Sequence, residues 1–450
     1  MNVDDRRRGI PSPRLLLGLA AAAAIVFAIT RWADPPAPPL APPARLLPAS
    51  VAGQDQPAAL AMIDRQLASD LKDAQQTPDW LTLSRLAGDH SARFRLSGDY
   101  RDLAAAQAII DRAMALAELR TGPHLAAAAI ALQGHRLAAA EPMLDAIGHY
   151  AMLPDDVTLS EVQALRGDIA FYRGDYRAAL RDYLAADGTG GGAGTASRRA
   201  LLLARTGDPA GALAALDKAD RAGPFTTPQA AANLTLQRGV VQLQSGDWPA
   251  AEASFAKANR IFPKHWLIEQ HLAQMLAVRG GIAGAVKLYE AAIARSRNPE
   301  TMDGLAALWR AQGDYAKASY WAGQAAPLWA ERLRLAPQAA FAHAFEHELV
   351  FGNPKRAGAL AVRDWRNRPH GGSAVALAWA LLANGRPADA LQVLDAVNAG
   401  FWRSAEQHAA AAEAHALLGQ SEAAAAEREK ALALNPRIFD RRAAMIWYGH

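Results

Sequence analysis

The sequence predicts an all-α protein made of stacked helical hairpins, and the main observation behind this is a glycine that recurs at nearly even intervals. The intervals are 33–40 residues, and apolar residues at helical spacing fill the segments between. A repeat of this length is typical of a solenoid, in which no hairpin can bury its apolar face alone. The ten glycines are Gly98, Gly134, Gly174, Gly207, Gly246, Gly280, Gly313, Gly352, Gly385 and Gly419.

Small and bulky residues keep fixed distances from the repeated glycine. An alanine follows nine of the ten glycines by five residues, as at Ala179 and Ala251, and a bulky residue such as Phe255 often follows by nine. Small residues on both sides of a turn let two helices approach closely, and a bulky residue fills the space beside them. An Asp directly after several of the glycines suits the start of the next helix. We therefore expect about ten hairpins over residues 77–436.

These residues resemble the tetratricopeptide repeat (TPR) family. The segments Leu165–Ala186, Gln237–Pro263 and Leu305–Ala325 carry its small–large–small pattern. The resemblance covers roughly residues 80–436 and implies a right-handed solenoid, although the second, eighth and tenth repeats match the pattern less well. HEAT-like repeats are the alternative, but they are longer and lack the Gly-Asp-aromatic turn.

The resemblance also implies where a partner would bind. In TPR proteins the first helices of successive hairpins line a concave groove that takes up peptides or helices. The matching positions here stand six and three residues before each repeated glycine. Phe171 and Trp379 are the candidate anchors, because aromatic rings offer large contact areas, and packing between hairpins is the alternative for both. The expected groove residues are Asp168, Phe171, Val240, Leu243, Gln274, Arg310, Glu346, Trp379, Leu382 and Glu413.

The region before the repeats divides into three parts. Residues 1–14 are short and basic, residues 15–33 are expected to form a transmembrane signal-anchor helix, and residues 34–55 form a proline-rich linker. The arginines before the apolar stretch predict a cytoplasmic N-terminus, with the repeats on the other side of the membrane. A cleaved secretion signal that releases the repeats into the periplasm is the alternative. The Ala- and Arg-rich composition suggests the inner (cytoplasmic) membrane of a bacterium.

Two segments that flank the repeats are expected to cover their apolar ends. Residues 56–76 place Leu60, Ile63 and Leu67 on one helical face and predict an N-terminal capping helix. Residues 437–450 contain Met445 and Trp447 and predict a C-terminal capping helix over the last hairpin. Solenoids need such caps, because their terminal hairpins each have one uncovered apolar face.

Composition and motifs give little sign of chemistry. The net charge is only +4 and the arginines are spread along the chain, which disfavours nucleic-acid binding, and the absence of cysteine excludes disulfides and thiol chemistry. His343, Glu346 and His347 form an H-x-x-E-H pattern, which is found in a class of zinc peptidases. The alternative is that they are polar residues on the exposed surface of the first helix of the eighth repeat. We expect no catalytic residues, no metal and no cofactor.

The sequence therefore predicts a non-enzymatic scaffold or assembly factor. Its partners are expected to be other proteins, which bind as a peptide or helix in the groove, together with the membrane through the N-terminal helix. One alternative is an envelope zinc metallopeptidase that uses the H-x-x-E-H pattern. The other is a periplasmic subunit that holds clients for an export or maturation machine.

Overall fold

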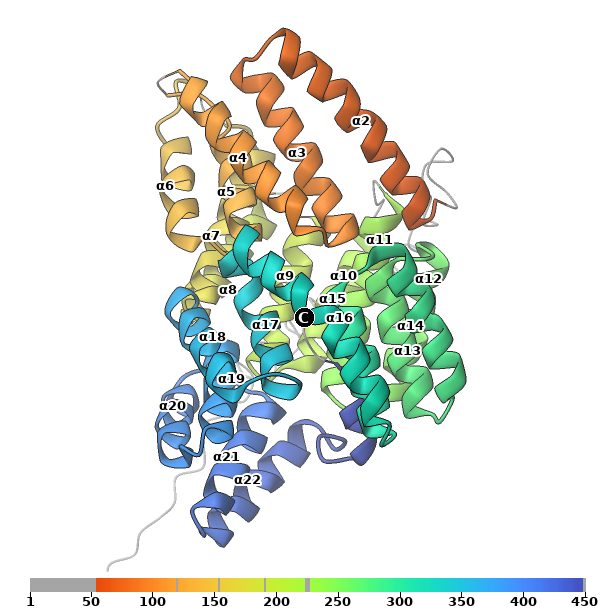
Figure 1. Ribbon diagram of the computed structural model, residues 1–450. Coiled ribbons are helices and arrows are strands. Elements are labelled where there is room, and N and C mark those ends of the chain that lie inside the picture. The colour runs from red at the N-terminus through yellow and green to blue at the C-terminus, as the bar shows by residue number, and fades with distance from the viewer. Residues whose placement is uncertain (1–53, 119, 153, 190–191, 223–226, 448–450) are drawn as a thin grey trace, which may run out of the picture. The chain divides into compact units, whose positions relative to one another are not determined.

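The computed structural model describes residues 54–447 except residues 119, 153, 190–191 and 223–226. This part of the chain is a stack of ten TPR-like helical hairpins preceded by one helix (Figure 1), which confirms the all-α solenoid that the repeats predict. The expected membrane segment, residues 15–33, and all but the last two residues of the proline-rich linker lie outside the described residues. Among the residues that are described, no helix combines the length and apolar character needed to cross a membrane.

Each hairpin pairs two consecutive helices. The single helix α2 (Gln56–Gln76) precedes them and packs on α3. The hairpins are α3 (Trp80–Ser97) with α4 (Tyr100–Leu116), α5 (His124–Gln133) with α6 (Leu137–Ile147), α7 (Asp156–Tyr172) with α8 (Tyr176–Gly188), α9 (Ala193–Arg205) with α10 (Pro209–Ala222), α11 (Pro228–Gln244) with α12 (Trp248–Ile261), α13 (Trp266–Val278) with α14 (Ile282–Ser296), α15 (Pro299–Ala311) with α16 (Tyr315–Leu335), α17 (Pro337–Val350) with α18 (Pro354–Asn367), α19 (Gly371–Ala383) with α20 (Pro387–Ala399), and α21 (Ala405–Leu417) with α22 (Ser421–Leu434).

The repeated glycine forms the turn inside each hairpin. Eight of the ten adopt a positive φ, which only glycine reaches at little cost, and this conformation ends the first helix. The second hairpin differs, because His135 (φ 52°) takes the left-handed conformation in place of Gly134. The eighth also differs: there Asn353 caps α18, and its backbone N–H donates to Glu348. Both hairpins are among the repeats whose sequences depart from the pattern.

The helices of a hairpin approach closely at the small residues. Ala251 on α12 is fully buried, and a Cβ on Gly239 of α11 would overlap the ring of Phe255. Gly167 and Tyr183 stand in the same relation between α7 and α8. The spacing of small and bulky residues therefore predicts the packing inside the hairpins.

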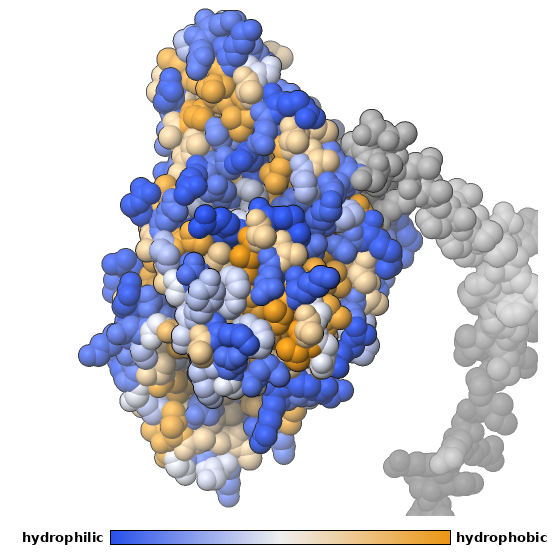
Figure 2. Space-filling view, turned by 45° about the vertical axis from the view of Figure 1, so that its right-hand side comes forward, coloured by the Kyte–Doolittle hydropathy of each residue, from blue (hydrophilic) through white to orange (hydrophobic). Residues whose placement is uncertain are grey.

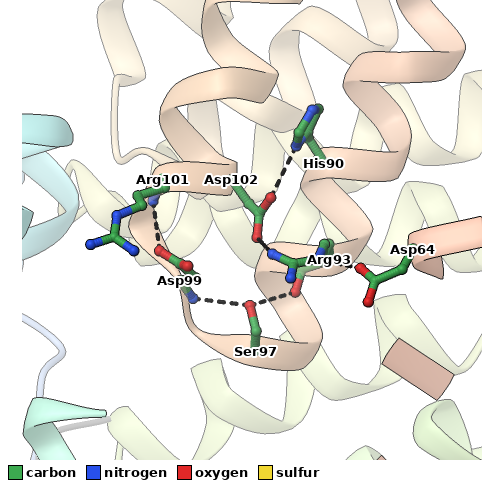
Figure 3. Close-up of polar contacts among 7 residues, drawn as sticks. All are labelled: Asp64, His90, Arg93, Ser97, Asp99, Arg101 and Asp102. Atoms are coloured by element: carbon green, nitrogen blue, oxygen red, sulfur yellow. Dashed lines mark hydrogen bonds and ion pairs between the residues drawn. The ribbon is translucent and has the colours of Figure 1, made fainter. Parts of the chain in front are cut away.

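Ion pairs also join neighbouring helices at the start of the stack. In Figure 3, Arg93 of α3 joins α2 and α4, because its Nε is 2.7 Å from Oδ1 of Asp64 and its Nη1 is 2.5 Å from Oδ2 of Asp102. His90 contacts the second oxygen of Asp102 through Nδ1 at 3.0 Å. On the face drawn in Figure 2 hydrophilic residues predominate, with apolar residues in separate patches between them.

Hairpins that are far apart in the sequence also touch. Nη2 of Arg332 donates to the carbonyl of Gly98 at 3.0 Å, across 234 residues, and Nδ2 of Asn367 donates to the carbonyl of His135 at 2.9 Å, across 232 residues. The backbone of Arg403 donates to the carbonyl of Arg205 at 2.8 Å. The turns of early hairpins thus lie against the loops between later hairpins, and the solenoid is wound tightly enough for its successive coils to make contact.

The C-terminal segment, which we define as residues 436–447, departs from the expected capping helix. Its only regular element among the described residues is a short 3-10 helix, η1 (Arg441–Met445), which packs against α13 and α15. Phe439 still contacts the last hairpin, with the guanidinium of Arg428 3.8 Å from its ring centre. The expectation of a helix over the last hairpin is therefore wrong. The apolar residues at the end of the segment are buried in the middle of the solenoid instead.

Candidate protein-binding site

The C-terminal segment lies on one face of α13, α15 and α17, which we call the inner surface. These are the first helices of the sixth, seventh and eighth hairpins, as expected for a groove. Gln274 of α13 is fully buried, and its Nε2 donates to the backbone carbonyl of Trp447 at 3.1 Å. The ring of Trp447 stacks on that of Phe351, directly after α17, with 5.7 Å between centroids.

A cavity of about 560 Å³ lies between the inner surface and the C-terminal segment. Its helical walls come from α15, α17 and the start of α16, and its remaining wall comes from the segment itself. Most of the lining is apolar, and Arg310 and Glu346 supply the charged groups. The lining residues are Ala307, Arg310, Ala311, Tyr315, Glu346, Leu349, Val350, Ala444, Ile446 and Trp447.

The two charged residues present different groups to the cavity. Arg310 is exposed, and its Nη1 donates to the carbonyl of Val350 at the end of α17. Oε2 of Glu346 is buried and has no hydrogen-bond partner. Burial raises the pKa of Glu346 to about 8, and the nearby carboxylates of Glu300 and Asp303 act in the same direction. At pH 7 the cavity therefore offers a guanidinium and a protonated carboxyl group, both of which donate hydrogen bonds.

A buried polar cluster underlies this part of the inner surface. Asp303 of α15 is fully buried, accepts a hydrogen bond from Nε1 of Trp329 at 2.7 Å, and lies 2.8 Å from Nδ1 of His347. Glu300 lies one helical turn earlier, 3.4 Å from Nη1 of Arg332. Burial raises the pKa of Asp303. The cluster joins α15, α16 and α17 and fixes the helices that carry the cavity.

The H-x-x-E-H pattern belongs to this cluster. His347 is paired with Asp303, and Nδ1 of His343 lies 3.6 Å from Oε1 of Glu300, so both rings are directed toward carboxylates of α15. The described residues contain no group of three His, Asp or Glu side chains placed to hold a metal ion. The two histidines therefore pack between first helices. They belong to the first helix of the eighth hairpin, as the alternative expects, but His347 is buried rather than on an exposed surface.

The other groove residues expected in the first half of the solenoid are covered by the chain itself. Phe171 is only 4% exposed, and its ring stacks on His370 and contacts Trp402. Leu243 is 1% exposed and shares an apolar cluster with Ile446. Asp168 accepts hydrogen bonds from Tyr183 and Arg198 and is partly buried. The expectation that Phe171 and Leu243 line an open groove is wrong, because a later coil covers Phe171 and Leu243 is buried in the cluster that contains Ile446. Asp168 is instead held by its near neighbours.

The remaining expected residues are scattered. Val240 is partly buried beside the cluster that contains Leu243, and Trp379 is partly buried between two apolar clusters. Leu382 is 9% exposed, whereas Glu413 is exposed on α21. Of the predicted set, the structure brings together Arg310 and Glu346, with Gln274 beside them through the C-terminal segment.

Several residues that line the cavity lie outside the positions six and three residues before the repeated glycine, from which the groove was predicted. Ala311 and Val350 each stand one residue beyond the expected positions, and Tyr315 comes from the start of the second helix. Ile446 and Trp447 come from outside the repeats. Their sequence signal is the run Met445-Ile446-Trp447, which is too apolar for a solvated tail but does not indicate which surface covers it.

No family model matches this chain, and no curated protein matches it. Among solved structures, a tetratricopeptide repeat protein from Parabacteroides merdae is 16% identical over 57% of this chain and 99% of its own, with a TM-score of 0.34. Yeast Tom70 is 14% identical over 82% of this chain and 93% of its own, with a TM-score of 0.34. One chain of the APC/C hetero-tetramer Cut9-Hcn1 is 12% identical over 86% of this chain and 93% of its own, with a TM-score of 0.35. Similarity at this level does not indicate which partners this chain binds.

Proposed function

We propose that this protein is a non-enzymatic scaffold that takes up an extended segment of a partner protein on its inner surface. The observation that carries this proposal is that the inner surface already holds a segment of polypeptide, the short 3-10 helix η1 followed by the extended residue Ile446. Ile446 has an extended backbone (φ −102°, ψ 121°), and the adjacent carbonyl of Trp447 accepts a hydrogen bond from Gln274. A surface that binds a backbone carbonyl and buries the flanking side chains has the chemistry of a peptide site.

The cavity next to this segment supplies the rest of the site. Its volume of about 560 Å³ is enough for one or two large apolar side chains. Arg310 and the protonated Glu346 would donate hydrogen bonds to carbonyl or carboxylate oxygens of the same partner. The partner that fits best is therefore an extended apolar segment rather than a folded domain.

Site-specific photo-crosslinking tests this function. A photoreactive amino acid at Ala311, which lines the cavity and is exposed, should crosslink partner proteins in cells. The same probe at Glu290, exposed on α14 and absent from the cavity lining, is the control. A few stoichiometric partners specific to Ala311 would support a scaffold, and many substoichiometric ones would support a client-holding subunit. Equal capture at both positions would contradict a binding role for the cavity.

We also propose that residues 15–33 anchor the protein in the inner membrane of a bacterium, with the repeats in the periplasm. The support is the apolar stretch, the arginines before it and the proline-rich linker after it. Because the chain has no cysteine, single cysteines report their own location. An impermeant maleimide should label Ser421→Cys in intact spheroplasts and Asn2→Cys only after lysis. Protection of Ser421→Cys would contradict this topology, and loss of the N-terminus would indicate signal cleavage.

A further inference from the structure

The C-terminal segment reaches the inner surface by a path that crosses the coils of the solenoid. It begins at Pro436, directly after the last hairpin, where Asn435 lies so close to Gly246 that a Cβ added to this glycine would overlap it. It then passes Trp248, over whose ring lie the guanidinium groups of Arg437 and Arg442. Apart from the contact between Phe439 and Arg428, the segment leaves apolar residues of the last hairpin such as Leu417 and Leu432 exposed.

The contacts at the end of the segment are those of a bound peptide. Met445, Ile446 and Trp447 are 5–6% exposed, and each packs against a different group of residues. Met445 packs in the cluster around α15 and α17, Ile446 packs in the cluster around α11 and α12, and Trp447 stacks on Phe351. The polar contacts of these residues include the hydrogen bond from Gln274 and a 3.5 Å contact between Nε2 of Gln312 and the sulfur of Met445.

The rest of the segment is bound more weakly. Arg441 and Ala444 are exposed, and Asp440 pairs with Arg437 and Arg442 of the same segment rather than with the repeats. Three apolar side chains at one end therefore provide most of the contact. The segment can leave the inner surface without disrupting a hairpin, because η1 belongs to no hairpin.

We propose that residues 440–447 are an internal ligand of the inner surface, which a partner displaces with an extended segment of the same chemistry. That chemistry is a pair of large aliphatic side chains followed by an aromatic one, as in Met445-Ile446-Trp447. The inference rests on the proposed function, because it names the regulation and the partner chemistry of that same surface. In the resting protein the segment lowers the affinity for every partner by competing with it.

The test uses the peptide of residues 440–447 (DRRAAMIW), labelled with a fluorophore, as the probe. The chain that ends at residue 436 should bind this peptide, and the full chain should bind it at least tenfold more weakly. A peptide with Trp447→Ala, and a chain with Phe351→Ala, should each bind at least tenfold more weakly than their parents. Circular dichroism establishes that the shortened chain is folded. A folded shortened chain that does not bind the peptide would overturn the proposal, as would equal affinity of the short and full chains.

A second variant covers the case in which the shortened chain does not fold. Ala311→Cys with Ala444→Cys places one thiol on each side of the cavity of the full chain, and a short bis-maleimide then fixes the segment in place. The fixed protein should lose its residual binding of the peptide, whereas the unreacted variant keeps it. Unchanged binding would overturn the proposal, as would a dimer of the full chain that forms through the segment of a second copy.

The two proposals fail in different ways. If the peptide binds but no protein crosslinks at Ala311, the inner surface is a self-binding site and the scaffold function is wrong. If proteins crosslink at Ala311 but the folded shortened chain ignores the peptide, the scaffold function stands and the internal ligand is wrong.

Discussion

Phe171 and Arg310 occupy equivalent places in their repeats but have different surroundings. Phe171 and Arg310 each stand three residues before the repeated glycine, and Glu346 stands six before it. Phe171 is buried under His370 and Trp402, whereas Arg310 is exposed at a cavity. The repeat pattern therefore sets which face of the helix a residue lies on. Contacts between distant hairpins decide whether that face is open.

The largest loss of stability is expected from a substitution inside a hairpin, at a position that lies neither under a later coil nor at the cavity. Ala251→Glu should unfold the fifth hairpin, at a cost of about 4 kcal/mol or more, because the site is fully buried and the new carboxylate has neither space nor a partner. Thermal melting followed by circular dichroism measures the loss. A stable Ala251→Glu variant would mean that the small-residue register is misassigned.

Phe171→Ala tests the covered side of the comparison. We expect a loss of about 3–5 kcal/mol in unfolding free energy, because the substitution leaves a cavity under His370 and Trp402. Leu349→Ala, at the same register position on the open side, is the matched control and should cost less, since Leu349 is partly exposed at the cavity. Denaturant unfolding of both variants compares them. Equal losses would show that the two regions do not differ in packing.

Glu346→Gln should stabilise the protein in a pH-dependent way. The folded chain holds this proton up to a pKa of about 8, whereas an unfolded glutamate releases it near 4.5. The folded state binds more protons between these values, so stability falls as the pH rises from about 4.5 to 8. The variant should match the parent near pH 4.5 and be more stable at pH 8. Melting temperatures of the variant and the parent, measured across this pH range, test this expectation. A difference that does not change with pH would contradict the raised pKa of Glu346.

Arg310→Ala should have the smallest effect on stability, within about 0.5 kcal/mol, because the side chain is exposed. We expect its effect on binding to be larger, with several-fold less photo-crosslinking from Ala311. Arg297→Ala, at an exposed arginine after α14 that is absent from the cavity lining, is the control for loss of positive charge. If both variants lower crosslinking equally, Arg310 contributes only general charge.

The fold could be predicted from the sequence because its determinants are local. Glycine at a turn, and Ala251 and Phe255 at fixed distances from it, encode the packing of one hairpin, and most of the ten repeats keep this pattern. The site could be predicted only in part, since the register identified Arg310 and Glu346 but also Phe171. Whether such a residue is buried or open depends on contacts between distant hairpins, such as that of Arg403 with Arg205, which link residues with no common motif. The position of Trp447 depends on the same distant contacts.

The contact between Gly246 and the loop at Asn435–Pro436 has a consequence for how the chain unfolds. An ordinary solenoid behaves as a one-dimensional array, in which an end frays while the middle stays ordered. Here the end of the tenth hairpin packs against the turn of the fifth. Hydrogen bonds between distant hairpins also join Gly98 to Arg332 and His135 to Asn367. Fraying at either end therefore removes support from the centre. The molecule should therefore unfold as one cooperative unit. In folding, these contacts between residues far apart in the sequence should form slowly and late.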